Sequence, residues 1–383
     1  MTNNPQSSQE SLQTAQTPLW AVLTITALGT WGTAIGWSAV YFLAEKQFGL
    51  TSAQNAWLGL VGGVGYTLVC LASSRLTSLL GRVGLSHRLI LMLTLCLMGI
   101  TSGFPPLVGE PWALWFFMAT FVPLQGLLWP ITESFLSGGR RGRRLRHATG
   151  GFNISWSVAA VLAMWFVAAT IEIDPDWSFY SLAVAQVLML LVIAIGFPLD
   201  PAPHLDDHEP KNGDRADHDR ERRLLLSFRG LNLLSYIMIA ALSPLLPALM
   251  GRLGLEGGAK PLVNSAWMIT RVIVFTAMQF WHGWHGRWRT VIWSFACIVA
   301  GICVAFLSPS ITVMVLGLAT FGVGAGGVSC AAIYYAMEVG SAEVDAGGKH
   351  EAITGLGYTI GPLLARLIAP DAPPVDGKPV ELK

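Results

Sequence analysis

Long apolar runs separated by short polar segments dominate the sequence, and they determine what the chain can fold into. A run of about 20 apolar residues is long enough to cross the hydrocarbon core of a bilayer as one helix. Backbone groups in lipid must be hydrogen-bonded within their own segment, so each run is predicted to be helical. Eleven runs are found, at residues 19–43, 53–73, 89–103, 111–136, 147–171, 177–197, 224–250, 261–283, 290–307, 311–336 and 352–368.

The composition indicates a polytopic membrane protein. Hydrophobic residues make up 53% of the chain and charged residues only 12%, whereas a soluble domain has about 25% charged residues. All five cysteines lie inside apolar runs, so we expect from them neither a disulfide framework nor a metal site.

Lysine and arginine are distributed unequally between alternate loops. The loops around Arg82, Arg144, Arg220 and Arg287 carry most of them, and the opposite loops carry only three. Because cytoplasmic loops are enriched in these residues, the amino terminus is predicted to be cytoplasmic. With an odd number of spans, the tail after Ile368 is predicted to emerge on the other side.

We predict two helical bundles. Residues 1–18 form a polar leader, 19–198 a bundle of six spans, 199–223 a charged cytoplasmic linker, 224–368 a bundle of five spans and 369–383 a polar tail. The segment Ala119-Thr120-Phe121 recurs as Ala319-Thr320-Phe321. A shift of six spans preserves orientation, so the halves are predicted to be parallel repeats with a substrate site between them.

The chain resembles the major facilitator superfamily over residues 19–368. The resemblance rests on the six-plus-six plan, on the charged central loop and on two symmetric loops. Gly81-Arg82 keeps part of the family's D-R-x-G-R-R signature, with Ser78 where the acid is expected, and the symmetric loop reads Gly286-Arg287. The resemblance implies an all-α fold of two pseudo-symmetric bundles, in which the first, fourth, seventh and tenth spans line a cavity.

The family normally has twelve spans. Here the eleventh run is followed by APDAPPVDGKPVELK, which is too polar and too rich in proline to span a bilayer. The twelfth span of the family is a peripheral support. The resemblance therefore implies a short, eleven-span form that keeps the central cavity.

Arg271 is the most unusual residue in the apolar runs. It lies about ten residues, or roughly 15 Å at helical rise, from either end of its span. A cation at that depth costs about 2.5–3.5 kcal/mol on insertion scales, so it marks a functional site. Its planar fork of donors suits a carboxylate or a phosphate. The alternative is a structural arginine that caps carbonyls or pairs with a neighbouring helix.

Other polar and aromatic residues recur at helical spacing in the spans that the resemblance places around the cavity, or beside Arg271. Such faces must point at helices or water rather than lipid. The alternative for each residue is an ordinary interhelical hydrogen bond, worth about 0.6 kcal/mol on average. With Arg271, the predicted substrate site comprises Thr33, Trp37, Gln125, Trp129, Asn232, Tyr236 and Asn264.

A further set of charged residues is predicted to form cytoplasmic gates. By the resemblance, these acids and bases make and break ion pairs as the halves rock. The alternative for the basic residues is a positive-inside signal with surface salt bridges. The set comprises Arg82, Glu133, Arg140, Arg144, Arg287, Glu338 and Glu351.

The sequence thus predicts a secondary active or facilitative transporter that moves a small, anionic solute across the cytoplasmic membrane of a bacterium. It contains no Walker motif, and no acidic residue is found near the middle of a span, so the coupling ion is left open. We expect the solute and the lipid bilayer as partners, and no enzymatic activity, cofactor, metal or nucleic acid. The alternative is a non-transporting membrane sensor or assembly partner built on a transporter fold.

Reporter fusions test the predicted topology. Two reporters are used, one that is active only in the cytoplasm and one that is active only outside it. Inserted in the linker, within residues 199–223, only the cytoplasmic reporter should be active. Fused after Lys383, only the external reporter should be active. Activity of both in the same compartment would show that the count of eleven spans is wrong.

Overall fold

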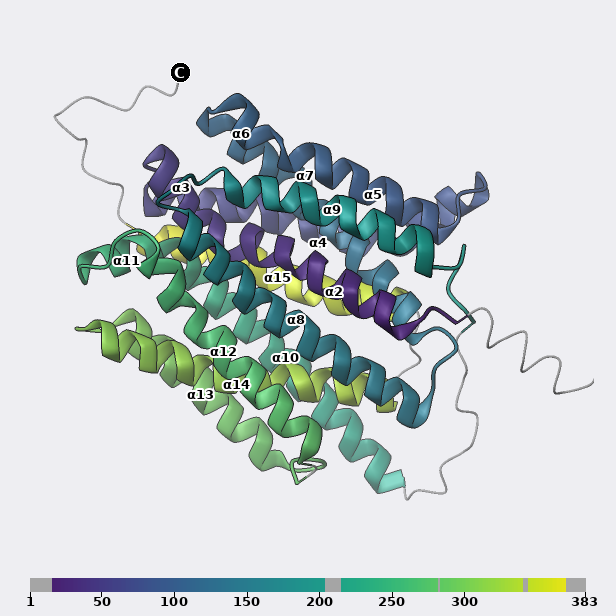
Figure 1. The fold of residues 1–383 in the computed structure, drawn as a ribbon. Helices are drawn as coiled ribbons and strands as arrows, with labels where there is room; N and C mark the ends of the chain where they lie inside the picture. Colours follow the sequence, from purple (N-terminus) through teal and green to yellow (C-terminus); the bar gives the residue numbers. More distant parts are fainter. Residues whose placement is uncertain (1–15, 204–214, 282, 340–343, 370–383) are drawn as a thin grey trace, which may run out of the picture.

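The computed structural model describes residues 16–203, 215–281, 283–339 and 344–369, and every regular element in these ranges is a helix (Figure 1). Ten helical segments in the described part are long and apolar enough to cross a membrane. The last helix, α15 (Val344–Ile368), has 25 residues and packs among them. The predicted all-helical, multi-span fold is confirmed.

The amino-terminal half contains six of these segments. The first consists of α2 (Leu19–Ala34), the π-helical turn η1 (Ile35–Ala39) and α3 (Val40–Phe48). It is followed by α4 (Ser52–Arg82), α5 (His87–Ser102) with the short α6 (Phe104–Val108), α7 (Pro111–Ser137), α8 (Gly142–Thr170) and α9 (Trp177–Gly196). Helix α4 ends nine residues after the predicted span, because the helix continues through residues 74–82, which include Arg75 and Arg82.

The carboxyl-terminal half begins with a broken helix. It consists of α10 (Arg215–Leu242), the 3-10 turn η2 (Ser243–Leu245) and α11 (Leu246–Arg252), and Pro244 and Pro247 lie at the break. Proline removes a backbone donor and clashes with the preceding turn, which explains the interruption. The other helices are α12 (Ala259–Phe280), α13 (Trp288–Phe306), α14 (Ile311–Val339) and α15.

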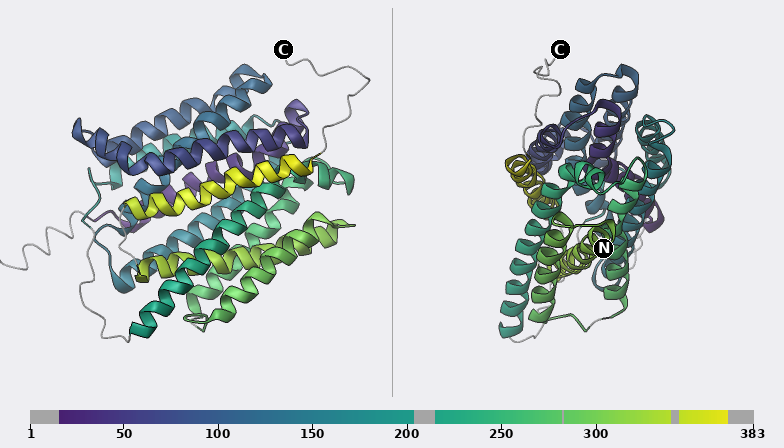
Figure 2. Two further views of the ribbon diagram at one scale, coloured as in Figure 1. Left: turned by 180° about the vertical axis from the view of Figure 1, so that it is seen from behind. Right: turned by 90° about the vertical axis from the view of Figure 1, so that its left-hand side faces the viewer.

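The halves meet mainly along two helix pairs: α4 packs against α15, and α8 packs against α12. Figure 2 shows α15, in yellow, running beside α4. At Gly63 the backbones are so close that an added Cβ would lie 2.2 Å from the Tyr358 carbonyl oxygen. Only glycine permits this approach, which maximises van der Waals contact between helices that gain little from the hydrophobic effect in lipid.

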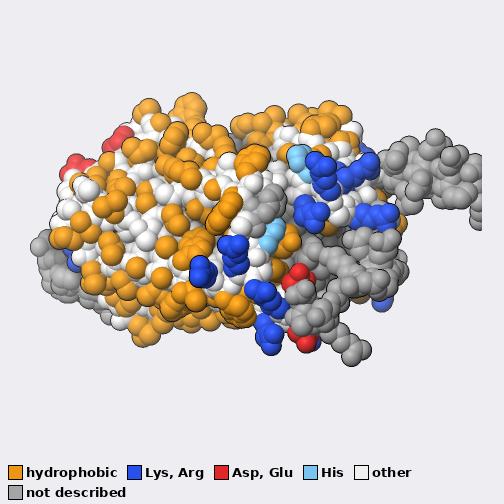
Figure 3. All heavy atoms as spheres, turned by 90° about the horizontal axis from the view of Figure 1, so that it is seen from below, with side chains coloured by type: hydrophobic (Ala, Val, Ile, Leu, Met, Phe, Trp, Pro, Cys, Tyr) orange, Lys and Arg blue, Asp and Glu red, His pale blue; other side chains and the backbone are white. Residues whose placement is uncertain are grey.

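Charged residues mark one end of the molecule. Lysine and arginine side chains gather there (Figure 3), and the start of α2 and both ends of the linker region lie at the same end (Figure 1). Helices α3 and α11 and the end of α15 lie at the opposite end, which we call the outer end.

Replacing Gly63 with valine should therefore destabilise the protein. The added side chain meets backbone atoms that cannot move aside, and overpacking of this kind costs about 1–3 kcal/mol. Thermal unfolding in detergent should show a lowered midpoint for Gly63→Val. Gly81→Val is the matched control, because nothing lies within 4 Å of a Cβ at Gly81 in the same helix. Equal midpoints for the two variants would contradict the close packing of α4 and α15.

Candidate functional site

A cavity lies between the two halves. Its lining comes from α2 with η1, α4, α7 and α8 in one half, and from α10, α12, α14 and α15 in the other. None of its lining residues, all in the described part of the chain, belongs to α5, α9 or α13. The cavity volume is about 60 Å³, whereas pockets that hold a small organic molecule measure about 300–1,000 Å³. A solute must therefore push the lining apart in order to bind.

Arg271 lines this cavity from α12 and is only 6% exposed. Its Nη2 donates a hydrogen bond to Ser329 Oγ (3.0 Å), and Ser329 Oγ donates in turn to Asn232 Oδ1 (3.1 Å). The guanidinium lies 4.5 Å from the ring centroid of Trp156 and 5.2 Å from that of Phe275. Arg271 Nε is buried and has no hydrogen-bond partner among the described residues. Aromatic faces and one hydroxyl therefore hold the cation in place while leaving it a free donor.

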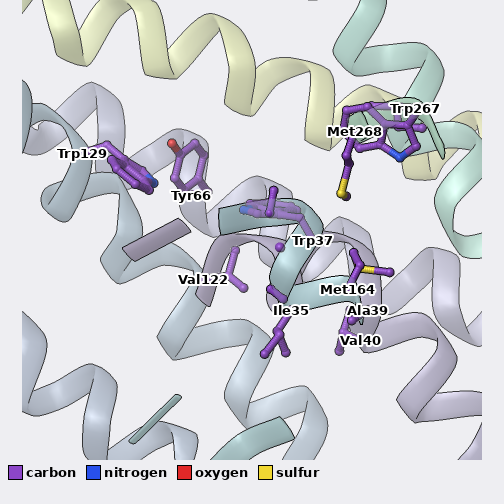
Figure 4. Close-up of a cluster of buried hydrophobic side chains, with 14 of the residues drawn as sticks. Ile35, Trp37, Ala39, Val40, Tyr66, Val122, Trp129, Met164, Trp267 and Met268 are labelled. Atoms are coloured by element: carbon purple, nitrogen blue, oxygen red, sulfur yellow. The ribbon is translucent and has the colours of Figure 1, made fainter. Parts of the chain in front are cut away.

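Four aromatic residues form a bridge between the halves. Trp37 stacks on Tyr358 with 3.8 Å between ring centroids, and its edge-to-face partner Tyr66 lies at 5.5 Å. Tyr236 completes the bridge at 5.3 Å from Tyr358. Trp37 lies in the π-helical turn η1, and π-helical turns occur frequently at functional sites. Figure 4 shows Trp37 and Tyr66 in one buried cluster with Trp129.

Two acidic side chains enter the same cavity. Glu133 lies on α7, one helical turn after Trp129, and Glu351 lies on α15 next to His350. The Tyr66 hydroxyl donates a hydrogen bond to the Glu351 carboxylate. The sequence placed Glu351 just before the eleventh span. Because α15 begins at Val344, eight residues before the predicted start, Glu351 lies inside the helix and faces the cavity.

Most of the predicted substrate-site residues lie together. Arg271, Thr33, Trp37, Trp129, Asn232 and Tyr236 line the cavity. Gln125 lies behind the lining and accepts a hydrogen bond from Thr33 Oγ1 (3.1 Å). Asn264 is 1% exposed and is not a lining residue, and its two amide atoms have no partner in the described part of the chain.

The structure adds lining residues that the sequence did not single out. They are mainly aromatic or small, and in an apolar run such residues cannot be distinguished from those that pack against neighbouring helices. The only available signal was the spacing of Asn153 and Trp156, which places a polar and an aromatic group on one face of α8. The principal additions are Tyr66, Phe152, Asn153, Trp156, Phe275, Ser329, His350 and Tyr358.

The predicted gating residues do not pair with Glu133 in this structure. Arg140 instead donates to the carbonyl oxygens of Phe135 (3.2 Å) and Leu136 (2.7 Å) at the end of α7, and to that of Thr17. The side chains of Arg82, Arg144 and Arg287 are exposed, and no salt bridge joins any of them to Glu133 among the described residues. The side chain of Glu338 lies outside the described part of the structure.

The outer end of the cavity is closed by contacts between the halves. Lys260 Nζ, at the start of α12, lies 2.6 Å from Glu45 Oε2 on α3. Beside it, a Cβ on Gly258 would lie 2.0 Å from the Ala168 carbonyl oxygen. A larger hollow of about 550 Å³ opens at this surface. Arg271, Glu133 and Glu351 instead line the cavity between the halves, called the inner cavity below, and we place the candidate site there.

Metal binding finds no support in the described residues, because they contain no group of three or more histidine, cysteine, aspartate or glutamate residues that could hold an ion. The inner cavity combines one arginine, two glutamates and many aromatic rings. Such a lining offers charged groups and aromatic ring faces to a small molecule.

Two helical bundles with a polar cavity between them are typical of a secondary transporter. The sequence model of the Major Facilitator Superfamily matches residues 19–362. The chain belongs to this superfamily and is a multi-pass membrane protein, which confirms the predicted family. Its relatives of known structure are transporters and not enzymes.

Three solved structures show the similarity in fold. A bacterial homologue of the human lysosomal transporter Spinster, inward-facing and unoccupied, is 15% identical with a TM-score of 0.64, over 90% of this chain and 80% of that one. The human organic anion transporter MFSD10 is 15% identical with a TM-score of 0.64, covering 92% and 94%. A peptide transporter in complex with sulfate is 14% identical with a TM-score of 0.66, covering 94% and 92%. No curated protein sequence matches.

The ion pair between Lys260 and Glu45 should hold the outer end closed. Lys260→Gln removes an attraction between the halves and should increase labelling of a cysteine introduced at Trp37 from the outside. Lys46→Gln is the matched control, because Lys46 pairs with Glu172 (2.7 Å) within one half. The charge swap Lys260→Glu with Glu45→Lys should restore low labelling. Equal labelling of the Lys260→Gln and Lys46→Gln proteins would rule out a sealing role for the pair.

Proposed function

We propose that the protein transports a small organic anion across the cytoplasmic membrane of a bacterium by alternating access. The observation that carries this proposal is Arg271, a buried cation in the cavity between the halves. It forms no salt bridge among the described residues. A guanidinium removed from bulk water attracts an anion strongly, because the local dielectric constant is low.

The geometry of Arg271 suits an oxyanion. Its hydrogen bond to Ser329 and its contacts with Trp156 and Phe275 orient the planar group without neutralising its charge. A carboxylate or a similar planar or tetrahedral oxyanion can accept two parallel hydrogen bonds from such a fork. Lysine would keep the charge and lose this geometry.

The remaining lining supports a solute with a planar, apolar body. Eight of the eighteen lining residues are aromatic, whereas aromatic residues make up 10% of the chain. Aromatic faces stack on flat rings and add about 0.5–1.5 kcal/mol per pair beyond burial. The Trp37–Tyr358 stack is the pair that such a ring would displace or extend.

Alternating access is supported by the arrangement of contacts around the cavity. The outer end is closed by the Glu45–Lys260 pair, and the halves remain in contact along α4–α15 and α8–α12. Breaking the outer pair while keeping those two helix pairs would open the cavity at the outer end. Rocking of one repeat against the other is the usual motion of this architecture.

A sensor or assembly partner built on the same fold is the alternative function. It would bind the anion without moving it. Purified protein in liposomes distinguishes the two, because only a transporter exchanges labelled solute across the bilayer.

Substitution of Arg271 tests the anion site. We expect Arg271→Lys to weaken binding of benzenesulfonate and benzoate about tenfold or more, and Arg271→Ala to abolish it. Binding is measured by calorimetry and by the rise in thermal midpoint that a ligand of the folded state produces. Arg252→Ala removes an exposed cation at the outer end and serves as the control. If Arg271→Ala binds both acids normally but unfolds at a lower temperature, Arg271 is structural and the proposal fails.

A further inference from the structure

Glu133 presents an unpaired carboxyl group to the inner cavity. It lies on α7 in the amino-terminal half, whereas Arg271 lies on α12 in the other half, and both side chains line the cavity. The Glu133 carboxyl group forms no hydrogen bond or salt bridge within the described part of the chain. Arg271 Nε likewise has no hydrogen-bond partner there. The cavity therefore offers an unpaired acid from one half and an unpaired donor of a cation from the other.

The charged groups in and beside the cavity balance one another. Glu133 and Glu351 carry two negative charges when ionised. Arg271 and Arg229 carry two positive charges, and both act electrostatically on the lining residue His350. Like charges on the two arginines disfavour a third cation there. A solute that is only an anion or only a cation adds an unbalanced charge, whereas a solute with one charge of each sign leaves the balance unchanged.

Aromatic rings lie beside both unpaired groups. Trp129 is one helical turn before Glu133 on α7, and Phe275 is one turn after Arg271 on α12. Residues four positions apart lie on the same face of a helix, and both rings line the cavity. A flat ring placed between the halves thus has an aromatic neighbour next to each charged group, and stacked or edge-to-face contacts with these neighbours are favourable.

We infer that the solute is an aromatic zwitterion, whose carboxylate binds Arg271 and whose ammonium group binds Glu133. This inference rests on the proposed function, because it requires the anionic group of the solute at Arg271. It narrows the solute from any organic oxyanion to one that also carries an ammonium group, such as an aromatic amino acid. Because the two contacts come from different halves, a zwitterion bridges α7 and α12, and a solute with a single charge does not.

The ammonium group supplies the partner that the Glu133 carboxyl group lacks. A carboxylate removed from bulk water is costly unless it is paired and hydrogen-bonded. An opposite charge beside a carboxylate favours its ionised form, so ionised Glu133 and a bound ammonium group stabilise each other. Glu351 already accepts a hydrogen bond from Tyr66, and for this reason we assign the ammonium group to Glu133.

Matched ligands test the inference on wild-type protein by calorimetry. Hydrocinnamate is phenylalanine without the ammonium group, and phenethylamine is phenylalanine without the carboxylate. A second pair, para-aminomethylbenzoate and para-ethylbenzoate, has the same shape but places the two charges farther apart. In at least one pair, the zwitterion should bind about tenfold or more tightly than the anion, because hydrogen bonds between charged groups are the strong ones. Phenethylamine should bind more weakly than phenylalanine.

Substitution of Glu133 tests the assigned role. In Glu133→Gln, the affinity for the favoured zwitterion should fall about tenfold, to that of the matched anion. The affinity for the anion should stay the same or rise, because a negative charge has been removed. Glu133→Asp keeps the charge and should keep a preference for the zwitterion. Glu110→Gln removes an exposed carboxylate just before α7 and is the control that should keep the full preference. An equal loss of affinity for both ligands in Glu133→Gln would show a structural role and refute the inference.

The outcomes separate this inference from the proposed function. If both anions bind wild-type protein as tightly as the matched zwitterions, and Arg271→Ala abolishes their binding, the inference is refuted and the anion site stands. If neither the zwitterions nor the anions bind wild-type protein, or if Arg271→Ala leaves their binding unchanged, the anion site is refuted and the inference fails with it.

Discussion

The enclosed charge of Arg271 is the constraint on which the rest of the structure depends. A guanidinium near the middle of a span cannot face lipid without a cost of several kcal/mol, so α12 must present it to protein or water. The structure provides that environment between the two bundles, where Ser329 accepts a hydrogen bond and Trp156 and Phe275 offer their ring faces. The polar side chains of seven other helical segments are brought to the same place. Charged and polar groups of both halves avoid the lipid by facing one another, and the cavity lies where they meet.

Close packing and polar contacts have different roles in holding the halves together. Along α4–α15, Gly63 allows the backbones to touch, and this contact does not depend on charge. At the outer end, the Glu45–Lys260 pair adds a contact that water and ions can replace. The proposed alternating access would use both kinds of contact: a lasting contact between the halves, and a closure whose free energy is small enough to reverse.

The cavity brings together side chains that can carry opposite charges. Arg271 brings a guanidinium to the cavity, Glu133 and Glu351 bring carboxyl groups, and the stacked rings of Trp37 and Tyr358 lie beside them. Charges of both signs within one low-dielectric enclosure make the binding of any ion depend on the protonation of its neighbours.

Particular residues show how far the sequence can be read. The helical spans, the charged linker and the family follow from local features, because the free energy of placing a segment in lipid is set by that segment's own residues. The depth of Arg271, and the polar face that includes Thr33 and Trp37, follow from the same reasoning with the 3.6-residue period. By contrast, Glu351 was placed at a turn before the eleventh span, since the polar residues around it conceal where α15 begins.

The sequence by itself determined the fold class, the approximate span boundaries and the presence of a charge that needed a partner. Only the tertiary structure decided which side chains meet: that Tyr66 donates to Glu351, that Trp37 stacks on Tyr358, and that Gln125 and Asn264 lie off the lining. The physical reason is one of range. Transfer from water to lipid and helical periodicity act within a segment, whereas the faces that two helices present to each other depend on the summed packing of residues far apart in the sequence, such as Trp37 and Tyr358.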